Sequence, residues 1–306
     1  MKIAIMGAGG VGGFYGARMA RAGEDVTLIA RGPHLEAIQK NGLRVESATV
    51  GNFSVKEVKA TAEPAEVGPV ELVWMTVKTY DLQEAAQAIL PLIGPETAVI
   101  SLMNGVDVAE TIGAVVGIEH MLGGTVQLSA AIVAPGLIRH FTMDRMVFGE
   151  LAGGISPRGE AINRMLHGAG IEAKLSPTMR RAIWEKFIFL HAIAGVGSLT
   201  RSPAGPMRTE PESRALYISC LREAEALARK KGIDVEEGIA EKFAAFVDNL
   251  PPETKPSMLL DLERGRPLEL EALQGAVVRM GAELGVPVPV NEFIYAALRL
   301  HANGHA

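Results

Sequence analysis

The chain has 306 residues, 48% of them apolar and 21% charged, with 30 basic against 35 acidic side chains for a net charge of −5. This length is typical of two domains, and the composition provides a sizeable core and excludes an intrinsically disordered chain. The lack of a basic excess argues against a nucleic-acid-binding protein, and the single cysteine, Cys220, excludes an intrachain disulfide or a zinc site of several thiolates.

Short apolar runs alternate with helical patterns in the first half of the chain. The expected strands are residues 3–6, 26–30, 71–77 and 98–102, and the expected helices are residues 11–22, 33–39, 81–89 and 108–115. This alternation is typical of βαβ units and a parallel sheet. From about residue 125 to 149, β-branched runs interrupted at Pro135-Gly136 predict a hairpin that extends the sheet in antiparallel fashion.

The second half shows helical patterns only. Ser176-Pro177 resembles a helix N-cap followed by proline at the first helical position. The helices are expected at residues 177–194, 209–231, 235–248, 255–264, 267–284 and 290–303. The sequence therefore predicts two domains with a boundary near residue 175.

Two features predict a cytoplasmic protein with no membrane segment. The chain begins with a strand-like run at residues 2–6 in place of a signal-peptide pattern. The longest apolar run lies between Lys186 and Arg201, contains His191 and two glycines, and is too short to span a bilayer.

A glycine-rich loop directly follows the first expected strand and opens the first helix. Here a first glycine permits the tight turn, a second lets a pyrophosphate approach the backbone amides, and a third allows close packing of helix on strand. The pattern predicts a dinucleotide site at Gly7, Ala8, Gly9, Gly10, Val11 and Gly12.

The end of the second strand favours NADP(H) over NAD(H). No carboxylate follows Ile29 that could bind a ribose 2′-hydroxyl, and Asp25 lies too early in the strand. Arg31 stands where a guanidinium could pair with a 2′-phosphate, which favours NADP(H), and the less favoured alternative is an ordinary solvent-facing residue.

Two further polar residues follow expected strands. Lys78 and Asn104 come at carboxyl ends, where ligands of open α/β sheets bind. They could reach a cofactor or a substrate; simple loop chemistry is an equal alternative, since Asn-Gly is a common turn dipeptide.

The helical half contains one lysine and one glutamate of interest. Lys186 has only apolar neighbours at i±3 and i±4, so desolvation would lower its pKa and make it a useful proton donor. The alternative is that it extends its amine to water. Glu269 has inward-facing neighbours, but acids are also common in a first helical turn, where Glu271 could serve equally well. His140 and His191 have no metal-ligand partner at helical spacing and are interpreted as structural; no metal site is expected.

Taken together, these residues resemble the ketopantoate reductase (2-dehydropantoate 2-reductase) family along nearly the whole chain. The matching motifs are Gly7-x-Gly9-x-x-Gly12, Arg31, Val77-Lys78, Asn104-Gly105, Gly124-Thr125, Pro135-Gly136, Trp184-x-Lys186, Ser257-Met-Leu-x-Asp261 and Arg266-Pro-x-Glu269. The resemblance implies an α/β Rossmann-type domain at residues 1–175 and an all-α domain at residues 176–306, which binds substrate and could support a homodimer. It also implies NADPH-dependent reduction of a small 2-oxo acid in pantothenate synthesis.

The resemblance assigns roles residue by residue. The glycine loop, Arg31, Lys78, Asn104 and the backbone of Ala130 would hold NADPH. Lys186 would be the general acid and Glu269 a second catalytic residue that also binds the substrate hydroxyl. Asn104 and Ser257 would help to hold the substrate.

The chain departs from the family pattern at several positions, including the stretch at residues 195–201. The family commonly has asparagine four and eight residues after the catalytic lysine, where this chain has Leu190 and Ala194, and a later Asn-Gly is Gln274-Gly275 here. A more apolar pocket would favour a related 2-oxo acid over ketopantoate. The first alternative function is a reductase of the same fold that acts on a different oxo acid or an imine. A non-catalytic NADPH-binding sensor is the alternative from another class, although a sensor would not need Lys186 and Glu269.

Overall fold

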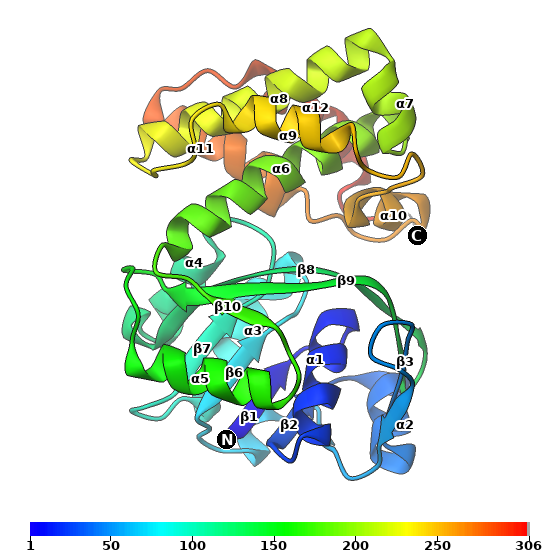
Figure 1. The fold of residues 1–306 in the computed structure, drawn as a ribbon, viewed down its shortest axis with the longest axis vertical. Coiled ribbons are helices and arrows are strands. Elements are labelled where there is room, and N and C mark those ends of the chain that lie inside the picture. The colour runs from blue at the N-terminus through cyan, green and yellow to red at the C-terminus, as the bar shows by residue number, and fades with distance from the viewer. Residues whose placement is uncertain (305–306) are drawn as a thin grey trace. The chain divides into compact units, whose positions relative to one another are not determined.

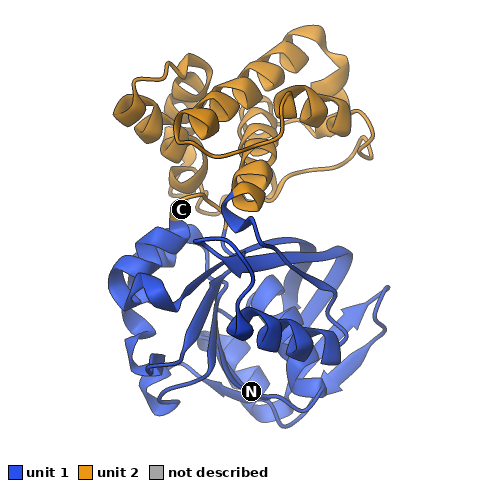
Figure 2. Cartoon of the chain, turned by 60° about the vertical axis from the view of Figure 1, so that its left-hand side comes forward, with its two compact units in different colours: residues 1–103, 108–180 blue, residues 104–107, 181–306 orange. Residues whose placement is uncertain are grey.

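The structure is a computed structural model that describes residues 1–304, and its chain forms two compact units (Figure 2). Unit 1 comprises residues 1–103 and 108–180. Unit 2 comprises residues 104–107 together with the chain from residue 181 onward. The short segment 104–107 therefore packs with the helical part of the chain although it directly follows a strand region of unit 1.

Unit 1 is built on a single mixed sheet (Figure 1). Within the described residues its strands are β1 (Lys2–Met6), β2 (Asp25–Ile29), β3 (Leu43–Ser47), β4 (Phe53–Val55), β5 (Lys59–Thr61), β6 (Leu72–Met75), β7 (Ala98–Ser101), β8 (Met121–Ala134), β9 (Leu137–Glu150) and β10 (Ala173–Leu175). The order is β4-β3-β9-β8-β7-β6-β1-β2-β5, with β10 on β9. In the part of the sheet ordered β8-β7-β6-β1-β2-β5, neighbouring strands pair in parallel. The nearly continuous apolar runs of the central strands β1, β6 and β7 reflect burial on both faces.

The β8–β9 hairpin turns at Pro135-Gly136 and is antiparallel, as the sequence predicts. Gly136 has a φ of 73°, which suits a glycine in this turn. The hairpin also joins the parallel strands to β3, because β9 pairs with β3 in parallel.

Helices pack against this sheet. They are α1 (Gly10–Arg21), α2 (Gly32–Asn41), α3 (Leu82–Ala88), α4 (Val108–Val116) and α5 (Pro157–Gly168), with short 3₁₀ turns η1 (Pro64–Glu66), η2 (Thr79–Asp81), η3 (Leu90–Leu92) and η4 (Ile118–His120). Phe14 and Tyr15 from α1 share one core cluster with Leu166 from α5 and with the strands.

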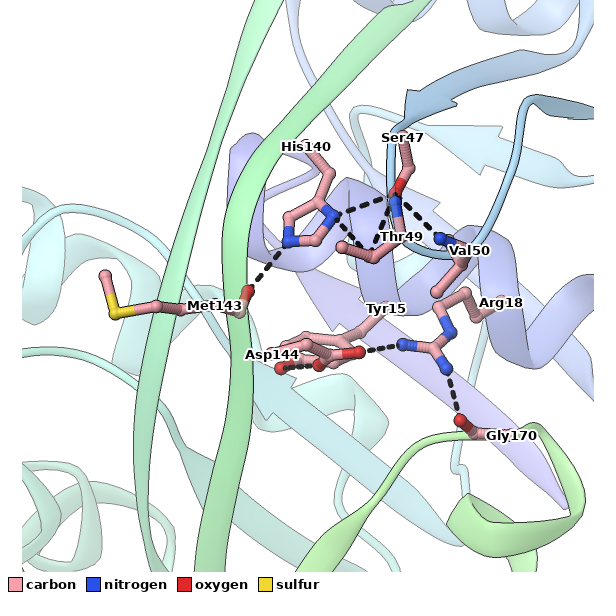
Figure 3. A network of polar contacts seen from close by, with 9 residues as sticks. All are labelled: Tyr15, Arg18, Ser47, Thr49, Val50, His140, Met143, Asp144 and Gly170. Atoms are coloured by element: carbon pink, nitrogen blue, oxygen red, sulfur yellow. Dashed lines mark hydrogen bonds and ion pairs between the residues drawn. The ribbon is translucent and has the colours of Figure 1, made fainter.

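Polar contacts fix α1 to β9 and to the turn after α5 (Figure 3). Tyr15 donates to Asp144 Oδ1 at 2.7 Å, and Arg18 forms an ion pair with Asp144 and donates to the Gly170 carbonyl. Beside this group, His140 is buried and its ring bonds the Met143 carbonyl at 2.7 Å, so packing and hydrogen bonding hold this ring within unit 1. These contacts hold the helix that begins at the glycine loop.

Unit 2 is helical. Its elements are α6 (Met179–Thr200), whose first two residues belong to unit 1, α7 (Ala204–Thr209), α8 (Pro211–Lys230), α9 (Ile239–Val247), α10 (Ser257–Glu263), the π-helical segment η5 (Glu271–Gly275), α11 (Ala276–Leu284), α12 (Pro289–Leu298) and η6 (Arg299–His301). The predicted fold class, α/β for the first part of the chain and all-α for the second, is confirmed.

The structure corrects two details at the start of α6. The helix begins at Met179, so Ser176-Pro177 lies before it; the expected cap signature belongs instead to Ser156-Pro157, where Ser156 Oγ accepts from Gly159 N at 3.1 Å. The helix is also longer than the apolar run within it, and by length and composition it could cross a membrane. Its apolar side chains, including Phe187 and Ile188, pack in the core of unit 2, so we interpret it as the core helix.

Candidate functional site

The glycine loop between β1 and α1 has a tight conformation that hydrogen bonds from a neighbouring segment support. Gly7 has a φ of 102°, a region that residues with a side chain rarely adopt. Thr76 follows β6 and donates to the carbonyl oxygens of Gly7 at 2.7 Å and Met6 at 3.1 Å. The loop is therefore fixed by the neighbouring strand before any ligand binds.

Each glycine after the turn has its own steric reason. A methyl group on Gly12 would overlap the Gly7 carbonyl, and one on Gly10 would overlap the Ala130 carbonyl of β8. A methyl group on Gly9 would meet no protein atom within 4 Å. The protein packs tightly around Gly10 and Gly12 and leaves the backbone open at Gly9, where a ligand phosphate could approach.

The start of α1 provides amide donors for such a phosphate. The first hydrogen bond within the helix runs from Gly13 N to Gly9 O at 2.7 Å. The amides of Gly10, Val11 and Gly12 precede it, and the positive end of the helix dipole lies at the same place. The predicted dinucleotide site thus fits the residues present.

A cavity of about 200 Å³ adjoins this loop within unit 1. Its lining comes from the glycine loop, the end of β2, and the segment after β6: Met6, Gly7, Ala8, Gly9, Ile29, Ala30, Arg31, His34, Val77, Asp81, Glu84, Ala85 and Ile132. Arg31 is one of these residues, and its guanidinium is paired with Glu84 at 2.5 Å. Glu84 is not among the residues predicted from the sequence.

His34 is another lining residue that sequence reasoning missed. One ring nitrogen bonds the Ala8 carbonyl at 3.0 Å, and the other accepts from Gly136 N at 3.0 Å. Burial lowers the pKa of this histidine, although the Ala8 carbonyl acts in the opposite direction. A neutral ring therefore ties the glycine loop to the tip of the β8–β9 hairpin. The available signal was its position about one helical turn after Arg31.

The remaining predicted cofactor residues have different surroundings. Lys78 is half-buried in unit 1, three residues after the end of β6 and immediately before η2. Ala130 belongs to β8 and its carbonyl faces Gly10 of the loop. Asn104 packs in unit 2.

Three predicted residues of unit 2 come together as a hydrogen-bonded group, which we call the polar triad: Lys186, Asn104 and Glu269. Lys186 Nζ donates to Asn104 Oδ1 at 3.1 Å, and Asn104 Nδ2 donates to Glu269 Oε2 at 3.1 Å. The cation and the carboxylate together fix the orientation of the amide between them, since only its oxygen can accept and only its nitrogen can donate.

Local structure explains how each member reaches the triad. Lys186 lies on α6 between buried Trp184 and Phe187. Asn104 precedes Gly105, whose φ of 114° allows the chain to turn there. Glu269 is 6% exposed and lies just before η5, and π-helical turns are frequent at functional sites.

Burial is the main influence on the lysine of the triad. It lowers the pKa of Lys186 to about 8, while the charge of Glu269 acts in the opposite direction. The alternative Glu271 is exposed and bonds Tyr295 at 2.7 Å and Arg279 at 3.2 Å. The structure therefore separates the two glutamates and joins only Glu269 to the lysine.

Other residues singled out in the sequence lie outside the triad. Ser257 is the exposed first residue of α10. Ala194 is 1% exposed in the helical core, and Leu190 is half-buried against the same core. Gln274 of η5 is fully buried against α6, where it donates to the His191 carbonyl at 2.6 Å. Within residues 1–304, no three His, Cys, Asp or Glu side chains gather as metal ligands would.

The comparisons with known proteins agree along the whole chain. Residues 3–153 match the family model "Ketopantoate reductase PanE/ApbA", and residues 178–302 match its C-terminal counterpart. The fold and these matches define a nicotinamide-dependent oxidoreductase that acts on a CH–OH group. More particularly, the chain belongs to the ketopantoate reductase PanE/ApbA family, whose members act on small 2-oxo acids.

Individual relatives cover nearly the full length. A 2-dehydropantoate 2-reductase of Mesorhizobium japonicum is 33% identical over 98% of this chain and 97% of its own. The uncharacterized oxidoreductase YkpB of Bacillus subtilis is 30% identical over 98% and 99%. A crystal structure of a PanE/ApbA family ketopantoate reductase from Ralstonia eutropha JMP134 has a TM-score of 0.91 at 33% identity and covers 99% of this chain and 98% of its own.

Proposed function

We propose that this protein reduces ketopantoate to pantoate with NADPH, as a step of pantothenate biosynthesis. The observation that carries the proposal is the polar triad, in which a desolvated lysine is hydrogen-bonded to an amide that is itself oriented by a buried carboxylate. Names of relatives at about 30% identity support the same substrate.

Within this proposal, unit 1 holds the cofactor. The amides at the start of α1 bind the pyrophosphate, the open backbone at Gly9 admits it, and Arg31 pairs with the 2′-phosphate. Lys78 and the Ala130 backbone are proposed as further contacts. When bound, the reduced nicotinamide supplies a hydride to the ketone carbon.

Residues of unit 2 supply the proton that the ketone oxygen receives. The Lys186 ammonium hydrogen-bonds the ketone oxygen and gives it a proton as negative charge develops there, and it regains a proton from water afterwards. Asn104 directs the ammonium, because its Oδ1 accepts from Lys186 Nζ. Glu269 holds Asn104 and accepts from the substrate hydroxyl, and Ser257 and Asn104 help to hold the carboxylate and hydroxyl of the substrate.

A substrate panel tests this function. Purified protein is mixed with NADPH and each of several 2-oxo acids, and NADPH oxidation is followed by its absorbance. Ketopantoate should give the highest kcat/KM. A clearly higher value with another 2-oxo acid would replace the substrate, and no turnover with any of them, while NADPH still binds, would indicate the sensor.

A second candidate, a reductase of a more apolar 2-oxo acid, is favoured by Leu190. This side chain lies one helical turn after Lys186 on α6 and is half-buried, where the family commonly has asparagine. Leu190→Asn should then shift the ratio of kcat/KM values toward ketopantoate by about tenfold, because one good polar contact is worth roughly 1–1.5 kcal/mol.

The control for this change is Ala194→Asn. Ala194 lies in the core, so its replacement should lower stability without altering substrate preference. An unchanged preference in Leu190→Asn would place residue 190 outside the substrate pocket.

The cytoplasmic location and the homodimer stay predictions.

A further inference from the structure

The cofactor cavity of unit 1 contains an unexpected balance of charge. Arg31 is the only lysine or arginine among its lining residues in the described chain, whereas two carboxylates, Asp81 and Glu84, line it as well. His34, also in the lining, has its pKa lowered by burial. A cavity that receives a multiply charged anion would be expected to carry an excess of cationic groups, so the acidic side chains call for an explanation.

The three charged groups form one cluster. Arg31 is paired with Glu84 at 2.5 Å, and both side chains are about two-thirds exposed, at 67% and 65%. Burial raises the pKa of Asp81; the charge of Arg31 lowers that pKa and the charge of Glu84 raises it. The single guanidinium thus faces two carboxylates from the segment that follows β6.

This pairing has a direct consequence for a 2′-phosphate. To pair with the Arg31 guanidinium, the 2′-phosphate must approach the Glu84 carboxylate, which is already paired with that guanidinium. A ligand with only a 2′-hydroxyl is not repelled and could donate a hydrogen bond to that carboxylate. Glu84 therefore disfavours the binding of NADPH and tolerates the binding of NADH.

We infer that Glu84 is a cofactor-specificity residue, which competes with the 2′-phosphate for Arg31 and so narrows the preference of this protein for NADPH over NADH. The inference deepens the proposed function and rests on its assignment of Arg31 to the 2′-phosphate. It concerns the binding of the cofactor, because Glu84 belongs to α3 and lines the cavity of unit 1.

The test measures dissociation constants of NADPH and NADH without substrate, by calorimetric titration of the full chain. The readout is the discrimination ratio, defined as Kd for NADH divided by Kd for NADPH. The exposed ion pair between Arg31 and Glu84 is weak, and the repulsion between the Glu84 carboxylate and the 2′-phosphate is of comparable size. Glu84→Gln should therefore raise the discrimination ratio about three- to tenfold, mainly through tighter NADPH binding. The increase should shrink at high salt, which screens exposed charges.

Two further variants make the result specific. Glu96→Gln removes the same charge from an exposed position outside the cavity and should leave the ratio unchanged. In an Arg31→Ala background, Glu84→Gln should no longer raise the ratio, because the competition acts through the guanidinium.

The outcomes separate the inference from the function beneath it. An unchanged or lower ratio in Glu84→Gln, with a wild type that prefers NADPH, overturns the inference and leaves the cofactor assignment intact. A wild type whose ratio is near one, and stays so in Arg31→Ala, contradicts the assignment of Arg31. An equal rise with Glu96→Gln would reduce the effect to net charge and overturn the role of Glu84.

Discussion

At the scale of single residues, the polar triad depends on an amide between two opposite charges. Asn104 offers its oxygen to Lys186 and its nitrogen to Glu269. The arrangement keeps the ammonium within hydrogen-bonding reach of an acceptor while burial lowers its pKa to about 8. A lysine of this kind loses its proton more readily than a solvated one and still carries it near neutral pH.

Lys186→Ala should lower kcat by about 10²–10⁴-fold, the usual contribution of a positioned general acid. Since only the protonated amine can donate, kcat/KM for the reduction should fall as the pH rises through about 8. Steady-state rates from pH 6 to 10 would measure this limb. Lys186→Arg is the matched control: it keeps the charge, and because arginine does not titrate in this range, its residual activity should lack the limb. An active alanine variant with the wild-type limb would return Lys186 to a solvated role.

The sequence reveals the members of the triad but not the bonds between them. The apolar neighbours of Lys186 are visible at helical spacing, whereas Asn104 is separated from it by 82 positions. Helical spacing alone does not distinguish Glu269 from Glu271; the family motif favours Glu269, and the packing separates the two physically by burying one and exposing the other. Glu84 and His34 were missed because their partners lie 53 and 102 positions away.

At the scale of elements, the glycine loop shows that adjacent glycines serve different purposes. Gly9 has an ordinary extended conformation with φ −72° and ψ −161°, and no protein atom occupies the space that a side chain there would enter. Gly10 is pressed against the Ala130 carbonyl of β8. The packing of the protein requires a glycine at position 10, whereas at position 9 it leaves open space that the proposed dinucleotide would enter.

The pair Gly9→Ala and Gly10→Ala separates these purposes. Gly9→Ala should leave the melting temperature nearly unchanged and weaken NADPH binding at least tenfold, since the methyl group occupies the path of the pyrophosphate. Gly10→Ala should lower stability by about 1–3 kcal/mol, because the hairpin must move away from the new methyl group. Thermal unfolding and NADPH titration of both variants measure the two effects. Wild-type affinity in Gly9→Ala would show that the pyrophosphate passes elsewhere.

The predicted strands with nearly continuous apolar runs are confirmed, and short strands without such runs were missed. The buried strands β1, β2, β6 and β7 were expected because their apolar runs are nearly continuous. The short strands β3, β4 and β5 carry many polar residues and owe their form to pairing with neighbours distant in sequence. Residues 267–284 were expected to form one helix, but the helical structure begins with the π-helical segment η5, which brings Gln274 against α6 at Gly195.

At the scale of the whole chain, unit 2 contains a buried polar network that resembles a catalytic constellation without the properties of one. Cys220 Sγ lies 3.4 Å from His191 Nε2 and 3.4 Å from Asn291 Oδ1, and Asn291 bonds Glu223 at 2.8 Å. All three of Cys220, His191 and Asn291 are fully buried, and burial raises the pKa of the thiol, so no thiolate nucleophile is available. The network joins α6, α8 and α12 and is structural.

His191 should make the stability of unit 2 depend on pH. Burial lowers the pKa of His191 to about 4 from an ordinary value of 6.5. Below pH 6.5 the imidazole of His191 becomes protonated in the unfolded chain, whereas in the folded chain it stays neutral until about pH 4. The contribution of neutral His191 to the free energy of unfolding is therefore fully present above pH 6.5 and is lost as the pH falls to about 4. The loss amounts to roughly 3 kcal/mol.

The measurement uses the two tryptophans of the chain, one in each unit. Trp74→Phe leaves Trp184 of α6 as the reporter of unit 2, and its fluorescence is followed during urea unfolding at pH values from 7 to 4.5. In that background, His191→Phe keeps a ring for stacking on Phe187 but cannot titrate. It should be less stable at pH 7, since it loses the bond to the Phe187 carbonyl, and its stability should fall less steeply with acid, by up to about 1.4 kcal/mol per pH unit. His167→Phe makes the same replacement on α5 of unit 1, outside the unit that Trp184 reports, and should keep the original slope. An unchanged slope in His191→Phe would show that the acid sensitivity of unit 2 arises from other groups.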